Sequence, residues 1–227
     1  MADPQTTPVR ILSVDSDPGA TAVVKATIAK AFVLEPNNDF FCADPAQNEA
    51  RWLAIADLVL AGNPSAPWLH VLGSGEEAVA VAYPYPEHKA PEDAPPPPGV
   101  MEVMQASARP EAGPVREQFM AYLGDKKAAF HQEHGPFMYL SFLAVRPEWQ
   151  GKGLGSRLLR HLSDKADAAG RWMYLEATTP DNQRLYERHG FVALETKVWT
   201  DPALPGQRVM LIPMGRPPQP PKQPKQQ

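Results

Sequence analysis

The sequence is poor in cysteine and has no long apolar run. Cys42 is the only cysteine in 227 residues, so the chain can form neither an internal disulfide nor a thiolate metal cluster. No apolar run approaches the length of a membrane span, and the first residues, MADPQTTPVR, lack the apolar core of a signal peptide. We therefore expect a cytoplasmic protein that does not contact a membrane. Cys42 itself is expected to be a small buried apolar residue rather than a nucleophile.

An excess of positive charge is also missing. The formal net charge is −4, and three basic residues, Arg216, Lys222 and Lys225, lie near the C-terminal end, so the rest of the chain is more acidic still. An acidic body disfavours a nucleic-acid groove and is compatible with a cationic or amine substrate. Apolar residues make up 43% of the chain, which is enough to bury a core. The sequence leaves open whether the protein is a monomer or a homodimer.

Proline is abundant and marks the organisation of the chain. Seven of the 27 prolines lie in PYPEHKAPEDAPPPP, residues 84–98, which predicts an extended loop that forms neither helix nor central strand. Residues 1–8 are expected to be flexible, and the Pro-, Lys- and Gln-rich residues 215–227 are expected to be a disordered tail. Residues 9–214 then form one domain with the proline loop as an insertion.

Helical and strand patterns alternate within that domain, which predicts a mixed α/β sheet with helices packed on it. Asp17 stands where a helix N-cap is expected, with Pro18 at the first helical position. We expect strands over 9–14, 68–73, 77–84, 137–145, 172–178, 191–199 and 208–214, the second and third forming a hairpin. We expect helices over 17–32, 47–60, 101–133 (interrupted at 108–114), 151–169 and 181–189.

The stretch LAVRPEWQGKGLGSRLLRHL, residues 143–162, places three glycines between an apolar strand and an amphipathic helix. Free N–H groups and the positive end of the helix dipole make such a position a ready site for phosphate oxygens. Glycine lets the backbone approach an anion closely. The alternative is a tight turn whose glycines serve helix–sheet packing.

Three phosphate-binding patterns compete for this loop. A P-loop fails because Arg146 stands where glycine is required, and a dinucleotide fingerprint fits poorly because Ser156 replaces its last glycine. The pattern Q/R-x-x-G-x-G/A is satisfied in full by Gln150, Gly153 and Gly155. The motif is short, so the packing alternative stays open at this point.

This loop resembles the central motif of the GCN5-related N-acetyltransferases, the GNAT family. The resemblance continues through LEATTPDNQRLYERHGFVALE and covers residues 137–196 most strongly. HVLGSGEEAVAVAYPYPE, the segment LEATTPDNQRLYERHGF and the closing RVMLIPM are similar to puromycin N-acetyltransferase-like members. The resemblance implies an α/β (α+β) fold with a mixed, mostly antiparallel central sheet, a splayed central strand pair and helices on both faces.

The resemblance also implies acetyl-CoA as the acyl donor. The backbone of Leu143, Ala144 and Val145 would pair with the pantetheine arm, and the side chain of Asn182 would bond to the same arm. Asn182 or Asp181 could instead cap the following helix. The pyrophosphate would be held by the amides of one continuous loop, namely Gln150, Gly151, Lys152, Gly153, Leu154, Gly155 and Ser156.

The family's general acid corresponds to Tyr186, four residues after Asn182 and hence on the same helical face. An amine attacks the thioester, and a phenol can protonate the thiolate that leaves. Ordinary core packing is the alternative for this tyrosine. A backbone N–H near Val145 could stabilise the oxyanion.

The attacking amine must also lose a proton, directly or through water. Glu176 is the leading candidate for the base, because a charged residue in an otherwise apolar strand needs a reason. A solvent-facing or salt-bridged position is an equally acceptable explanation. Glu133 and His134 are reserve candidates, and the weak cluster of His131, Glu133 and His134 predicts no metal site.

Aromatic residues near the first two helices are candidates for the acceptor pocket, although core packing explains such residues as well: Phe32, Phe40, Phe41 and Trp52. The function implied is acetyl-CoA-dependent N-acetylation of a primary amine on a small molecule, with antibiotics or related metabolites, and hence antibiotic resistance, among the candidates. The alternatives are a catalytically silent acyl-CoA sensor or interaction module and an acetyltransferase of protein or peptide amines.

Overall fold

The computed structural model describes residues 7–62, 65–66, 68–86 and 95–220. Within them, eight strands form a sheet in the order β1-β2-β3-β4-β5-β8-β6, and β7 pairs with β8. The strands are β1 (Arg10–Leu12), β2 (Leu69–Leu72), β3 (Ala78–Tyr85), β4 (Phe137–Val145), β5 (Trp172–Ala177), β6 (Val192–Ala193), β7 (Lys197–Trp199) and β8 (Val209–Arg216). The α-helices are α1 (Pro18–Phe32), α2 (Asn38–Phe41), α3 (Asn48–Leu60), α4 (Val100–Ser107), α5 (Gly113–His134), α6 (Leu154–Ala168) and α7 (Pro180–Glu187).

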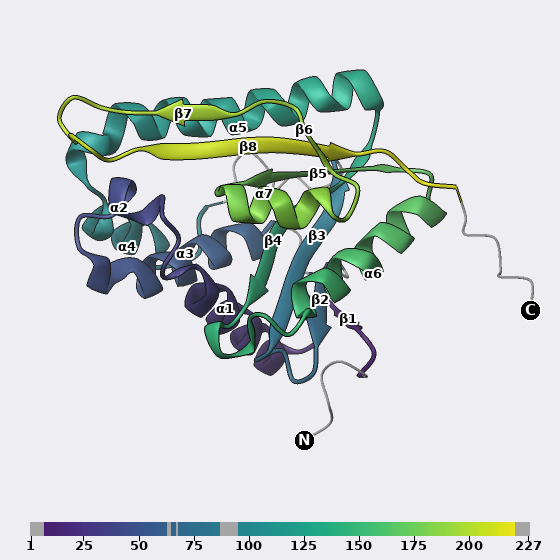
Figure 1. Cartoon of the computed structure of the whole chain (residues 1–227). Helices are drawn as coiled ribbons and strands as arrows, with labels where there is room; N and C mark the ends of the chain where they lie inside the picture. The colour runs from purple at the N-terminus through teal and green to yellow at the C-terminus, as the bar shows by residue number, and fades with distance from the viewer. Residues whose placement is uncertain (1–6, 63–64, 67, 87–94, 221–227) are drawn as a thin grey trace, which may run out of the picture.

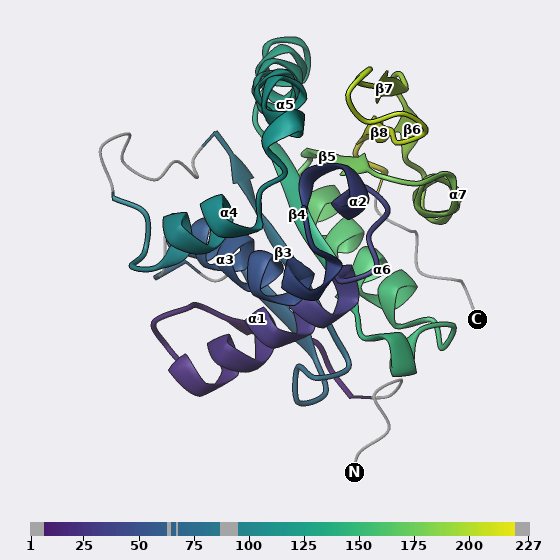
Figure 2. The same ribbon diagram turned by 90° about the vertical axis from the view of Figure 1, so that its left-hand side faces the viewer.

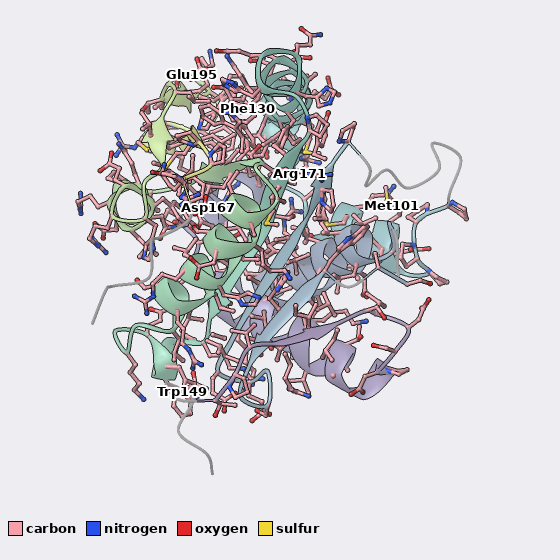
Figure 3. All side chains as sticks on the ribbon, turned by 90° about the vertical axis from the view of Figure 1, so that its right-hand side faces the viewer. Met101, Phe130, Trp149, Asp167, Arg171 and Glu195 are labelled. Carbon is pink, nitrogen blue, oxygen red and sulfur yellow. The ribbon has the colours of Figure 1, made fainter. Side chains whose placement is uncertain are left out.

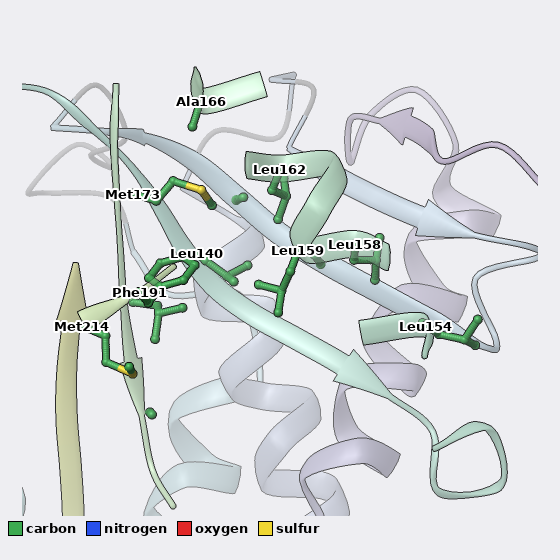
Figure 4. Close-up of a cluster of buried hydrophobic side chains, with 14 of the residues drawn as sticks. Leu140, Leu154, Leu158, Leu159, Leu162, Ala166, Met173, Phe191 and Met214 are labelled. Atoms are coloured by element: carbon green, nitrogen blue, oxygen red, sulfur yellow. The ribbon is translucent and has the colours of Figure 1, made fainter. Parts of the chain in front are cut away.

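Helices cover both faces of the sheet, as Figures 1 and 2 show. In Figure 2, α1, α3 and α4 lie on one side of β3 and β4, and α6 lies on the other. The α6 side contains the larger core cluster, in which Leu158, Leu159 and Leu162 of α6 pack on Met173 and Leu175 of β5 (Figure 4). Because α6 is fixed by this apolar stripe, the loop that precedes it is held at the end of β4.

The pair β4–β5 is the only parallel pair among the described strands, and it separates. Its register runs from Phe137↔Trp172 to Tyr139↔Tyr174 and then stops, although both strands continue. Beyond Tyr139, the edge of β4 that faces β5 is therefore not occupied by that strand. The predicted mixed, mostly antiparallel sheet with a splayed central pair is confirmed.

A β-bulge lies where the two strands begin to separate. Val81 is opposite Phe142 and Ala82 is opposite Leu140, so Ser141 is the extra residue on β4. Such a bulge re-aims the following side chains and increases local twist. The extra residue, Ser141, lies two residues beyond Tyr139, the last residue of β4 that pairs with β5.

The C-terminal end of α6 is tied to β8 by a buried ion pair. Arg216 is 5% exposed and donates to Asp167 Oδ1 and Oδ2 over 2.7 and 2.8 Å (Asp167 is labelled in Figure 3). One residue earlier, a Cβ at Gly215 would lie 2.7 Å from Phe130 Cε2, so only glycine lets α5 approach β8 here. β8 is thereby packed against both helices.

Several predicted boundaries differ from the structure. The helix expected from residue 151 begins at Leu154, because Gly151 and Gly153 have positive φ angles. The strand expected over 191–199 is divided into β6 and β7. The predicted tail loses Gly215 and Arg216 to β8, while residues 221–227 and 1–6 lie outside the described part of the chain.

The proline-rich segment begins later than predicted. Pro84 lies in β3 opposite Met138, in a stretch of β3 whose register with β2 has already ended at Val81. A proline lacks the N–H that a second neighbouring strand would require, and this stretch has β4 alone as a neighbour. Residues 87–94 of the predicted loop lie outside the described residues.

Candidate functional site

A cavity of about 620 Å³ opens where β4 and β5 separate. Its walls come from the ends of α1 and α7, from α3 and α5, from β4 and β5, and from the loop before α6. Most of the predicted donor-site residues line it: Leu143, Val145, Gln150, Gly151, Gly153, Leu154, Gly155, Ser156, Asn182 and Tyr186. Segments far apart in the sequence therefore meet at the place that the splay leaves open.

The glycines of the loop before α6 are not explained by close packing. Gly151 and Gly153 have φ angles of +74° and +77°, and a Cβ at either residue would meet nothing within 4 Å. At Gly155 a Cβ would contact Val145 Cγ2 at 3.6 Å, an ordinary van der Waals distance. Close packing therefore explains none of the three glycines. The first two are required by backbone conformation, and the space in front of them is open.

The start of α6 can hold an anion. Gly153 is its N-cap and supplies no side-chain cap, so no side chain at that position competes for the first N–H groups of this 15-residue helix. The loop is held to β4 because Gln150 Nε2 donates to the carbonyl of Val145 over 3.1 Å. Lys152 Nζ lies 4.3 Å from the centre of the Trp149 ring, which brings a positive charge near the loop. These features fit the diphosphate of a coenzyme A thioester.

Two predicted donor-site residues do not line the cavity. Ala144 is fully buried in the cluster under α1 and α3, so only its backbone belongs to the edge that faces the splay. The side chain of Lys152 lies on Trp149 instead of in the cavity wall. Neither placement tests the backbone contacts predicted for them.

Asn182 does not cap α7. Thr179 is the N-cap, and its hydroxyl accepts the N–H of Asn182 over 3.1 Å. The capping alternative for Asn182 and Asp181 is therefore wrong, because Thr179 already performs that role. Asn182 lies in the cavity wall one turn before Tyr186.

Tyr186 lies at the C-terminal end of α7 and packs edge-on against Phe191, with ring centres 5.9 Å apart. Burial, and next the negative charge of Glu35, raise the pKa of its phenol above the ordinary value. A phenol in such surroundings stays protonated at neutral pH and has a proton to donate. Tyr186 therefore both packs against Phe191 and lines the cavity.

Glu176 also reaches the cavity. Tyr139 donates its hydroxyl hydrogen to Glu176 Oε2 over 2.8 Å, whereas Oε1 is buried with no hydrogen-bond partner among the described residues. Burial raises the pKa of Glu176, while the nearby charge of Lys127 and the Tyr139 hydrogen bond oppose that rise. The solvent-facing explanation is wrong, because the carboxyl group lies between tyrosines inside the fold.

The reserve candidates for the base lie elsewhere. His134 stacks on Trp172 with ring centres 4.0 Å apart, at the far end of β5 from the splay. Glu133 lies 3.6 Å from His134 and is exposed. Neither residue lines the cavity.

The four predicted acceptor aromatics separate into two pairs. Phe32 and Trp52 line the cavity and pack on each other with ring centres 4.6 Å apart. Phe40 and Phe41 are buried in a separate cluster with Trp199 of β7, so core packing accounts for them. Three aromatic residues that the sequence did not single out also line the cavity, namely Phe119 of α5, Phe142 of β4 and Trp149 before the glycine loop.

Glu35 is a cavity residue that the sequence analysis missed. It lies between α1 and α2, and its Oε1 is buried without a hydrogen-bond partner among the described residues. Burial raises the pKa of Glu35, and hydrogen bonds from the Thr178 hydroxyl and the Asn37 backbone partly offset this. It stands alone in a loop with no motif around it, so no sequence signal pointed to it.

Among the residues that the structure describes, no group of three or more His, Cys, Asp or Glu side chains could hold a metal ion. No helix in the described ranges is long and apolar enough to cross a membrane. Cys42 is buried and unpaired by any disulfide, as expected.

Comparison with known proteins agrees with this geometry. Residues 116–193 match the family described as "Acetyltransferase (GNAT) domain". A Drosophila melanogaster polyamine N-acetyltransferase is similar in structure at 17% identity, with a TM-score of 0.61 and coverage of 92% of this chain and 99% of the other. A Corynebacterium glutamicum protein described as histone acetyltransferase HPA2 and related acetyltransferase shares 21% identity, with a TM-score of 0.57 and coverage of 95% and 99%. Arylalkylamine N-acetyltransferase 2 of Aedes aegypti shares 14% identity, with a TM-score of 0.57 and coverage of 93% and 99%.

At these identities the structural similarities show a shared fold, and the domain match shows that residues 116–193 are similar to a GNAT acetyltransferase domain. They do not single out puromycin N-acetyltransferase-like members, so that narrower resemblance stays a prediction from sequence. The prediction of a GNAT-family N-acetyltransferase is confirmed. The comparisons therefore identify a GNAT acetyltransferase domain match at residues 116–193, within a chain whose overall fold is shared with N-acetyltransferases.

Proposed function

We propose that the chain transfers an acetyl group from acetyl-CoA to a primary amine of a small molecule. The observation that carries this proposal is the meeting of an anion-ready glycine loop and a protonated tyrosine in one cavity. In this proposal the glycine loop before α6 binds acetyl-CoA, and the unpaired edge of β4 orients it. Tyr186 lies in another part of the cavity wall.

In this proposal the donor's diphosphate is bound by the amides from Gln150 to Ser156. Gly151 and Gly153 leave the approach to those amides open. The unpaired edge of β4 from Leu143 to Val145 supplies backbone groups for the pantetheine arm, and Asn182 contributes a side-chain amide from α7. Acetyl-CoA supplies the activated thioester.

Tyr186 acts as the general acid. Its raised pKa keeps the proton on the phenol until negative charge develops beside it, which is what protonation of a departing thiolate requires. A backbone N–H near Val145 is the candidate for stabilising the oxyanion.

Glu176 accepts the proton of the attacking amine, directly or through water. Its carboxyl group lies on β5 two residues beyond the last β4–β5 pair, at the start of the splay. The raised pKa brings a carboxylate closer to the range in which a general base is effective. Tyr139 donates to Oε2, and Oε1, beside the Tyr174 hydroxyl, is the oxygen proposed to accept the proton.

The acceptor in this proposal is a small amine. Beside the residues that bind the donor, aromatic rings and two carboxyl groups line the cavity, and they offer apolar contacts and negative charge to such a molecule. Two proteins that share the fold are named as a polyamine and an arylalkylamine N-acetyltransferase. Amines of antibiotics or related metabolites remain candidate acceptors on the sequence resemblance alone.

The direct test measures coenzyme A release from acetyl-CoA with a panel of amines, with acetylated products identified by mass. We expect turnover with at least one aliphatic or aromatic primary amine. Binding of acetyl-CoA without turnover on any amine, including peptide amines, would instead support an acyl-CoA sensor.

A further inference from the structure

Two carboxyl groups lie along one face of β5 inside the cavity. Tyr174 and Glu176 point to the face opposite Met173 and Leu175, which belong to the α6 core. Thr178 follows Glu176 at the next alternate position, about 7 Å further along the chain. Glu35 reaches this face from the α1–α2 connection, and the nearby Thr178 hydroxyl lowers the pKa of its carboxyl group. The two acidic side chains are therefore spaced along the cavity rather than paired.

Each of these carboxyl groups has one oxygen that receives no hydrogen bond. Glu35 Oε1 and Glu176 Oε1 both expose less than 1 Å². An acceptor atom buried without a partner costs stability, and a buried negative charge costs more unless it is paired. Glu176 Oε1 has the Tyr174 hydroxyl nearby, which is likewise without a partner among the described residues and lowers the pKa of Glu176. Glu35 Oε1 belongs to the cavity wall, where a ligand can supply the missing donor.

The two carboxylates differ in what surrounds them. Glu176 has a hydrogen bond from Tyr139 and lies near the positive charge of Lys127. Glu35 has neutral donors only, the Thr178 hydroxyl and a backbone N–H. Arg188 also reaches the cavity, but it is exposed and forms no ion pair with Glu35 within the described residues. The negative charge of Glu35 is thus the one that the fold leaves uncompensated.

Aromatic rings stand close to this uncompensated charge. Phe32, three residues before Glu35, packs on Trp52 and on Phe142 with ring centres 4.6 and 5.7 Å away. The indole N–H of Trp52 already donates to Asn38 Oδ1 over 2.9 Å, so the ring presents carbon to the cavity. Rings of this kind favour a cation or the methylene stem that carries one.

We propose that Glu35 binds a second positive charge of the acceptor, and that the substrates of this chain are amines with two basic groups. The inference rests on the proposed function and names the substrate class of the same site. One nitrogen is acetylated beside Tyr186 with Glu176 accepting its proton. The other remains charged and donates to Glu35 Oε1.

The test compares putrescine with n-butylamine, and p-xylylenediamine with 4-methylbenzylamine, in steady-state assays of coenzyme A release. The members of each pair have the same carbon skeleton apart from the second ammonium group. We expect the wild-type chain to prefer each diamine by at least tenfold in kcat/KM. Glu35→Gln keeps the shape and removes the charge, so it should raise KM for the diamines about tenfold or more and remove the preference, while any change in kcat that comes from the pKa of Tyr186 should be the same for monoamines and diamines.

Two control variants separate this role from others. Glu49→Gln changes an exposed glutamate of α3 and should leave both kinds of substrate unaffected. Glu176→Gln should lower kcat on monoamines and diamines alike, because it removes the proposed proton acceptor.

The outcomes are distinguishable. If wild type acetylates the monoamines as well as the diamines, or if Glu35→Gln keeps the wild-type preference for the diamines, the second-charge role is wrong and the proposed function stands. If wild type binds acetyl-CoA but acetylates no amine at all, the proposed function itself is wrong.

Discussion

Tyr139 donates its phenolic hydrogen to Glu176 Oε2 over 2.8 Å, joining β4 to β5 at the point where the two strands separate. The bond lowers the pKa of Glu176, which burial raises. Tyr139→Phe removes the bond and should raise that pKa further. Glu176 would then be protonated at higher pH, so the acid limb of the kcat/KM profile should move to higher pH.

The control for this prediction is Tyr85→Phe. Tyr85 stacks on Phe137 with ring centres 4.7 Å apart and does not line the cavity. Its profile should match that of wild type. An acid limb that stays in place in Tyr139→Phe would contradict the role of Glu176 as proton acceptor.

Glu35 should make stability depend on pH. Its pKa in the folded chain is raised above the ordinary value of 4.5. The contribution of protonated Glu35 to the free energy of unfolding is fully present below pH 4.5, the ordinary pKa, and is lost as the pH rises through the pKa of the folded chain. Glu35→Gln should therefore raise Tm by a few degrees at pH 7.5 and make little difference near pH 4.

Thermal melts across pH 4–8 measure this directly, with Glu49→Gln as the exposed control. A lower Tm for Glu35→Gln at pH 7.5 would show that the carboxylate stabilises the free protein. The uncompensated charge inferred above would then be wrong.

Gly153 and Gly170 form a matched pair for testing the anion loop. Both have positive φ angles, +77° and +62°, and a Cβ at either residue would meet nothing within 4 Å. Substitution by alanine should lower the free energy of unfolding of each variant by about 1–2 kcal/mol, because a side chain strains a backbone with positive φ. Gly153→Ala should also weaken coenzyme A binding at least tenfold, because its methyl group would occupy the open space in which we propose that the diphosphate binds, whereas Gly170→Ala should bind coenzyme A normally.

Calorimetric titration of both variants measures this difference after circular dichroism has confirmed that each is folded. Equal affinity in the two variants would mean that the open space at Gly153 is not where the diphosphate binds.

Tyr186→Phe should retain coenzyme A binding and the edge-on contact with Phe191, since only the hydroxyl is removed. If Tyr186 is the general acid, kcat should fall by about 10²–10⁴-fold. Single-turnover and steady-state assays on the best amine measure the loss. A variant with wild-type kcat would assign the acid role to another group or to water.

Much of the fold was predictable because local patterns and tertiary packing agree. The cap at Asp17, which accepts the N–H of Ala20, and the apolar stripe of α6 both act within a few residues. Pro84 was expected both as the end of the strand over 77–84 and as the start of the proline loop, and the structure places it in β3, which continues to Tyr85. Its tolerance there depends on β2 ending earlier than β3, which no local pattern reports.

The donor side of the site was predictable for the same reason, since its glycines and α7 form continuous motifs. The acceptor side was not. Glu35 acquires its role from Thr178, which is far away in the sequence, and Phe41 packs on Phe119 instead of facing the cavity. Side chains that meet only in the folded chain leave no spacing to recognise.

The central claim is that the main-chain nitrogens before and at the start of α6 bind the diphosphate of a coenzyme A thioester. Isothermal titration of the wild-type chain with acetyl-CoA tests it most directly. The account predicts saturable binding of one acetyl-CoA per chain, which inorganic pyrophosphate at high concentration weakens. Absence of any saturable heat for a folded sample would contradict it.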